Sequence, residues 1–166
     1  MGSLHAFETT FTNPLEIIER MAEERAWSLD RTNECEVNLV VSGSWSEVFV
    51  SLNWRDELES LQVACSYEMK VPANRKVEVG HLFTLINSRL FHGHFDVWEG
   101  DGSIVYRNTL VLAGGAVMNE KQCETLIRLG LEYCERYYPA IQYVCWAGKT
   151  GQEALEASMF QTVGEA

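Results

Sequence analysis

Two neighbouring stretches in the middle of the chain alternate between apolar and polar residues, and together they predict a β-hairpin. Within residues 47–55 the apolar parity holds Val48, Val50, Leu52 and Trp54. Within residues 60–69 it holds Leu61, Val63, Cys65, Tyr67 and Met69. Because successive side chains of a strand point to opposite faces, each stretch has one apolar face and one mostly polar face. The short charged link at residues 55–59 favours an antiparallel turn, so we expect a sheet with one buried side that helices or a second copy must cover.

Apolar residues recur at helical spacing in three other parts of the chain. The helices they predict cover residues 14–26, residues 74–91 and a segment that starts at Asn119. Asn13 is expected to cap the first helix, with Pro14 at its first position, and Gly93 is placed to close the second. Pro139 is expected to break or kink the third, because proline has no amide hydrogen and crowds the preceding turn.

Further extended runs complete the predicted sheet. Residues 37–41 form a strand before the hairpin, whereas the polar residues 29–34 are expected to be a connection. A Gly-Asp-Gly sequence at 100–102 separates two more extended runs, which is a strong hairpin signal. A short helix is expected from Thr150 to about Met159. The predicted fold is a single α+β domain of order αβββαββα, an antiparallel sheet packed with helices; it spans residues 13–160, after a loose leader at 1–12 and before a tail at 161–166.

Charge and cysteine usage narrow the classes of partner and compartment. The chain has 24 acidic and 13 basic residues and a formal net charge of −11, which repels phosphate backbones, so we expect no nucleic-acid partner. Its five cysteines form no CxxC pair and are expected to be reduced in a cytoplasmic protein. No window approaches 18 apolar residues and the first residues lack a signal-peptide pattern, so we expect no membrane contact.

No motif for catalysis stands out, and the protein is expected to be no enzyme and to have no catalytic residues and no cofactor. The Gly148-Lys149-Thr150 sequence lacks the first glycine of a phosphate loop, because Tyr143 stands there. His92 and His94 flank Gly93 and would need further convergent ligands to hold zinc or iron. We therefore expect no metal site and interpret both histidines as ordinary surface residues.

Large aromatic residues near arginines are the better candidates for function. Tryptophan and arginine are the residues most often found as anchors of protein interfaces. Near the predicted turns the candidates for partner binding are Trp54, Arg55, Trp98 and Arg107.

Several sequence segments resemble the YbjN-like bacterial proteins, which are described as sensory transduction regulators. The segments are LNWRDEL at 52–58, LQVAC at 61–65, GHFDVW at 93–98, RNTL at 107–110 and ERYYPA at 135–140. The resemblance covers residues 14–160. It implies a fold similar to that of type III secretion chaperones, often paired into homodimers, and brings no catalytic residues.

These observations lead to two hypotheses. The first is a non-enzymatic, cytoplasmic homodimer, chaperone-like or regulatory, that binds a protein or peptide partner on the polar face or the edges of the sheet. The alternative is a small-molecule or metal sensor with a pocket between the sheet and the helices.

Overall fold

The structure is a computed structural model that describes residues 13–164, with side chains described as far as residue 160. Its helices are α1 (Pro14–Glu24), α2 (Lys76–Asn87), α3 (Glu120–Trp146) and α4 (Gly151–Gly164). Its strands are β1 (Leu29–Asn33), β2 (Glu36–Ser42), β3 (Glu47–Arg55), β4 (Ser60–Lys70), β5 (His94–Val97) and β6 (Ser103–Val111). The expected leader at 1–12 and residues 165–166 lie outside the described residues, and α4 continues beyond the predicted domain end at 160.

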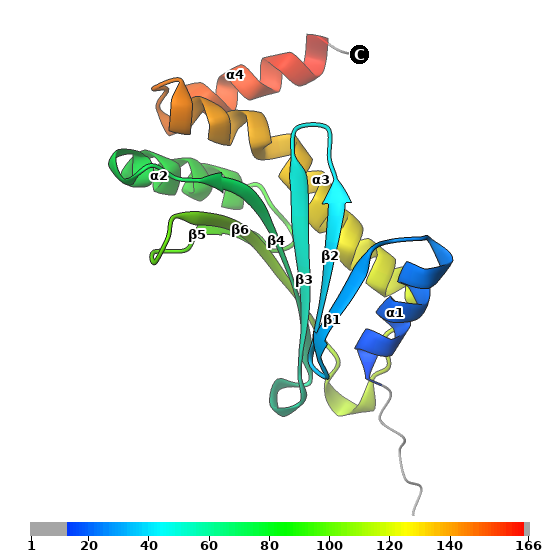
Figure 1. Cartoon of the computed structure of the whole chain (residues 1–166). Coiled ribbons are helices and arrows are strands. Elements are labelled where there is room, and N and C mark those ends of the chain that lie inside the picture. The colour runs from blue at the N-terminus through cyan, green and yellow to red at the C-terminus, as the bar shows by residue number, and fades with distance from the viewer. Residues whose placement is uncertain (1–12, 165–166) are drawn as a thin grey trace, which may run out of the picture.

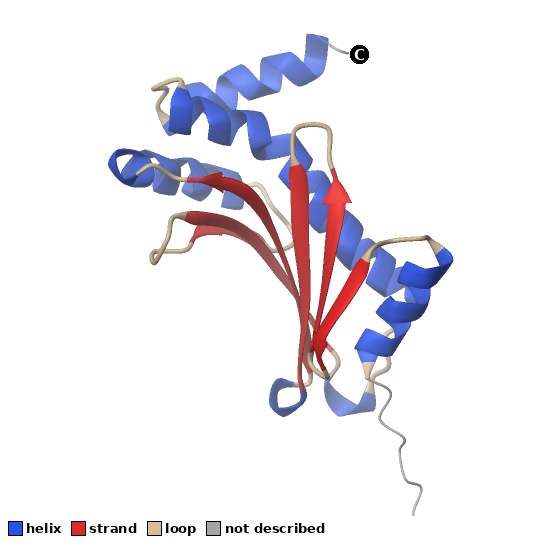
Figure 2. Cartoon of the chain, viewed as in Figure 1, coloured by secondary structure: helices blue, strands red, loops and turns tan. Residues whose placement is uncertain are grey.

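The strands form one antiparallel sheet in the order β1-β2-β3-β4-β6-β5. The helices lie on one side of this sheet, with α3 crossing it diagonally (Figures 1 and 2). The predicted α+β class and the antiparallel sheet packed with helices are confirmed. The structure adds one strand, β1, to the predicted order, and α4 is the short helix expected after Thr150. No helix covers the other side in the described part of the chain, and we call that side the open face.

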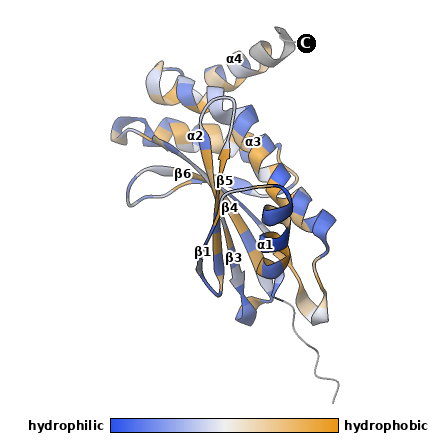
Figure 3. Cartoon of the chain, turned by 45° about the vertical axis from the view of Figure 1, so that its right-hand side comes forward, coloured by the Kyte–Doolittle hydropathy of each residue, from blue (hydrophilic) through white to orange (hydrophobic). Residues whose placement is uncertain are grey.

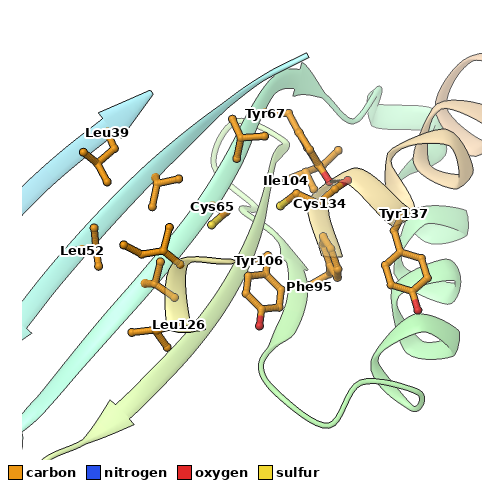
Figure 4. Close-up of a cluster of buried hydrophobic side chains, with 14 of the residues drawn as sticks. Leu39, Leu52, Cys65, Tyr67, Phe95, Ile104, Tyr106, Leu126, Cys134 and Tyr137 are labelled. Carbon is orange, nitrogen blue, oxygen red and sulfur yellow. Dashed lines mark hydrogen bonds between the residues drawn. The ribbon is translucent and has the colours of Figure 1, made fainter. Parts of the chain in front are cut away.

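The central hairpin is the one that the alternation predicts. Leu52 of β3 lies opposite Val63 of β4, and Val50 lies opposite Cys65, so one parity of both strands enters the core. The apolar and polar residues alternate along the strands in Figure 3, and the core side chains gather between sheet and α3 in Figure 4. Each fully buried aliphatic side chain contributes about 1.5–3 kcal/mol, which fixes the register.

Helix α3 begins as predicted but does not stop at the proline. The side chain of Asn119 accepts from the Gln122 amide at 2.8 Å, and the Gln122 side chain accepts from the Asn119 amide at 3.0 Å. Pro139 lies inside the helix, which runs on to Trp146, so of the predicted break or kink the break does not occur. Figure 1 shows α3 changing direction along its last turns, as a proline in a helix interior produces.

Two local predictions are wrong because contacts with later parts of the chain decide them. The polar residues 29–34, expected to be a connection, form β1, which pairs with β2 through Leu29 opposite Leu39. Helix α2 ends at Asn87 rather than residue 91. The Asn87 side chain donates to the Phe95 carbonyl at 3.0 Å and accepts from the Phe95 amide at 2.8 Å, which ties the helix end to β5.

Candidate functional site

The open face carries one parity of every strand. Strand pairing sets its residues in rows that cross the sheet. One row is mixed polar and charged, with Asn38, Ser51, Ala64, Arg107 and His94 side by side. The next row is more apolar, with Val40, Phe49, Ser66, Val105 and Asp96. The open face is therefore not a uniformly solvated surface.

A hollow of about 380 Å³ lies at the β4–β6 side of the open face. The small residues Ala64 and Ser66 of β4 line it, and their short side chains leave the space open. Trp98 follows β5 and is held at the hairpin by two backbone hydrogen bonds of 2.8 Å, one to the Ser103 carbonyl and one from the Gly102 amide. The Trp98 side chain lines the hollow together with Arg107 and is 60% exposed. The structure thus brings together two of the four residues that the sequence predicts for partner binding.

Charged groups at this hollow are paired within the chain. An Arg107 Nη2 atom donates to Asp96 Oδ2 at 2.7 Å. The buried Nε of Arg107 has no hydrogen-bond partner among the described residues. Asp101 accepts from the Ser103 amide at 3.0 Å and pairs with Lys70 at 3.0 Å. Hydrogen bonds from the Ser103 hydroxyl and amide, and then the Lys70 ammonium, lower the pKa of Asp101 to about 2, so its charge is retained.

The other two predicted residues lie elsewhere. Trp54 is only 2% exposed and faces the core, where its indole nitrogen donates to Asp56. This placement does not suit the predicted recognition role, because a partner cannot reach the ring without unfolding the hairpin. Arg55 is exposed at the hairpin end and forms a 3.3 Å ion pair with Glu57, away from the Trp98 hollow. We leave Trp54 out of the candidate surface.

A second hollow, also of about 380 Å³, lies between β6 and the first turns of α3. Leu110, Leu126 and Leu129 supply its apolar lining, and His92 and Lys121 are its ionisable groups. This is the kind of site, between sheet and helices, that the sensor hypothesis predicts.

Comparison with known proteins supports the resemblance seen in the sequence. The family model described as "Putative bacterial sensory transduction regulator", YbjN, matches residues 14–143. The chain belongs to the YbjN family. Among curated proteins, none matches the sequence of this family member at a significant level.

Solved structures show that the fold of this YbjN-family protein is shared. The ExsC–ExsE complex contains a chain with a TM-score of 0.55 and 18% identity, covering 74% of this chain and 88% of its own length. E. coli YbjN, described as a putative transcription regulator, has a TM-score of 0.52 and 13% identity, covering 89% and 92%. The predicted type III secretion chaperone-like fold is confirmed.

Sequence reasoning missed two residues of the open face in this YbjN-family protein. Val40 is 47% exposed and Phe49 is 38% exposed, and they lie opposite each other on β2 and β3. The available signal was parity, because both residues stand on the polar parity of their strands. An apolar residue at such a position is a better indicator of a binding surface than proximity to a turn.

Most thiols of this YbjN-family protein are buried. Four of its cysteines are buried, and Cys35 is exposed. Burial raises the pKa of Cys123 to about 12 and that of Cys145 to about 11, so these thiols stay protonated and unreactive. Among the described residues no group of three or more His, Cys, Asp or Glu side chains can hold a metal ion. None of the described helices is long and apolar enough to cross a membrane.

Proposed function

We propose that this YbjN-family chain is a non-enzymatic, chaperone-like regulatory protein that acts in the cytoplasm as a homodimer and binds a protein partner through the open face. The observation that carries the proposal is the Trp98 side chain, 60% exposed beside Arg107 over a hollow on an uncovered sheet. The family description supports a regulatory role. The ExsC–ExsE complex, a protein–protein complex of the same fold, supports a protein partner.

Physical considerations favour this surface for an interface. A tryptophan buries a large rigid area at low entropic cost, and arginine adds directional hydrogen bonds, which is why both are common energetic hot spots. The row with Val40, Phe49 and Val105 extends the apolar contact from the hollow across the sheet. The net charge of −11 attracts a partner with a basic contact surface and speeds their encounter at low salt.

The experiment compares Trp98→Ala with Trp146→Ala as a matched control. Trp146 is similarly exposed, at 67%, but lies at the end of α3. Each tagged protein is used to capture partners from the source cell, and its self-association is measured by sedimentation equilibrium. We expect the wild type and Trp146→Ala to recover the same partner and dimerise, and Trp98→Ala to lose at least one of these by about tenfold or more. Equal binding and equal dimerisation by all three proteins would refute the role of the open face.

A further inference from the structure

Strand β5 covers only part of the outer edge of β6. Its first residue, His94, pairs with Arg107. The chain before His94 turns away from the sheet at Gly93, whose φ is +67°. The carbonyl of the preceding residue, His92, accepts from the Tyr106 hydroxyl at 3.0 Å. Strand β6 continues to Val111, so its residues 108–111 extend beyond the end of β5.

The backbone groups at this exposed edge are those of Thr109 and Val111. In an antiparallel ladder, alternate residues direct both backbone groups to the same neighbour. Leu112 donates to the Glu59 carbonyl on the β4 side, whereas Ser103 accepts from Trp98 on the β5 side. Even-numbered residues of β6 therefore bond to β4, and Thr109 and Val111 point outward.

At one position of the free edge, a side chain of the same strand already bonds to the outward backbone amide. The Oδ1 atom of Asn108 accepts from the Thr109 amide at 2.9 Å. Val111 has no such contact among the described residues, and its side chain is 62% exposed. An unpaired amide and carbonyl at a strand edge are satisfied by water or by an added strand.

The groove beside this edge fits the side chains of an added strand. It is the hollow of about 380 Å³ between β6 and α3, and its apolar lining comes from Leu110, Leu126 and Leu129. Uncharged polar residues form most of its remaining lining: Asn108, Thr109, Asn119, Gln122 and Thr125. Among the residues that the structure describes, no carboxylate lines it, although the chain as a whole is strongly acidic. Its ionisable lining residues are Lys121, which already pairs with Glu124 at 3.1 Å, and His92, so the mostly uncharged groove suits neutral side chains.

We propose that the β6 edge at residues 108–111 takes up an extended, uncharged segment of a second protein as an added antiparallel strand, in line with β5. Apolar side chains at every second position of that segment occupy the groove between β6 and α3, and its backbone bonds to Thr109 and Val111. The inference rests on the proposed function only in that the occupant is a protein. It concerns a different surface from the Trp98 hollow.

Val111→Pro and Val111→Ala separate backbone pairing from side-chain contact. Proline removes the outward amide without breaking a ladder bond to β4, whereas alanine keeps the amide and shortens the side chain. The probe is a phage-displayed library of uncharged decapeptides selected on the wild-type protein. We expect the selected peptides to alternate apolar residues, to bind Val111→Ala within about threefold of wild type, and to bind Val111→Pro at least about tenfold more weakly. Circular dichroism and urea unfolding check that both variants are folded.

Amide exchange measured by NMR provides a second readout that does not depend on a variant. In the free protein the Val111 amide should exchange much faster than that of Leu112, and a selected peptide should slow it at least about tenfold. Asn108→Ala, which frees the Thr109 amide, should bind the peptide about two- to tenfold more tightly.

Three outcomes would overturn the proposal. The first is equal peptide binding by Val111→Pro, or no selectable peptide, which would leave a small molecule as the occupant of the groove. The second is a Val111 amide that is already protected in the free protein, which would mean that the chain covers its own edge. The third is loss of peptide binding in Trp98→Ala, which would place the peptide on the open face and support the proposed function instead.

Discussion

Replacing Gly130 by alanine tests how closely α3 approaches the sheet. A Cβ atom built at Gly130 would lie 2.7 Å from the Cys65 sulfur on β4, and 3.4 and 3.5 Å from two ring carbons of Tyr106 on β6. Both neighbours are fully buried, so neither has free space into which it can move. The substitution therefore forces either α3 or a core side chain to shift.

The expected size of the effect follows from two opposing contributions. Overpacking a core by one methyl group costs about 1–3 kcal/mol. Replacing glycine by alanine inside a helix returns about 1 kcal/mol through propensity and the entropy of the unfolded chain. Gly130→Ala should accordingly lower the free energy of unfolding by up to about 2 kcal/mol.

Gly80→Ala is the matched control, because it carries the second contribution without the first. Gly80 lies in α2, and a Cβ atom there would meet nothing within 4 Å. We expect Gly80→Ala to raise the free energy of unfolding by about 1 kcal/mol, so the two variants should differ by about 1–3 kcal/mol. Urea unfolding followed by circular dichroism measures both. Equal stabilisation by the two substitutions would show that α3 does not pack against Cys65 as described.

Two further predictions concern titration and thiol access. The pKa of Asp101 is lowered to about 2, so the contribution of its carboxylate to stability is present above about pH 4 and is lost as the pH falls toward 2. In urea unfolding, Asp101→Asn should therefore lose less stability than the wild type over that interval. An identical loss would contradict the assigned hydrogen bonds. The exposed Cys35 should react rapidly with a maleimide in the native protein, and the other four cysteines only after unfolding; mass spectrometry counts the adducts, and rapid labelling of Cys35→Ser would show that a thiol assigned to the core is accessible.

Local patterns predicted those parts of the fold whose residues decide their own structure. The β3–β4 hairpin and the Asn119 cap were correct because alternation and capping chemistry act over a few residues. Strand β1 was missed because it has little apolar character of its own and exists through pairing with β2. The end of α2 was misplaced because the Asn87 contact to Phe95 depends on a later strand.

The candidate site was predictable in part for a related reason. Trp98 and Arg107 meet at one hollow, although the sequence gives no direct sign of their proximity, because the β5–β6 hairpin brings them together. Trp54 could have been left out on parity alone, since it stands on the same parity as the buried residues Val48, Val50 and Leu52 of β3. The β6 edge was not predictable, because it depends on where β5 ends relative to β6.

The position of α3 in the chain has a consequence for biosynthesis. The sheet is complete once residue 111 has been made, but the helix that covers most of its apolar side spans residues 120–146. At about 5–20 residues per second, a ribosome adds this helix within seconds, after all six strands. During that interval the apolar face of the nascent sheet is uncovered. At this stage of synthesis the chain is therefore most prone to aggregate and to be bound by folding chaperones.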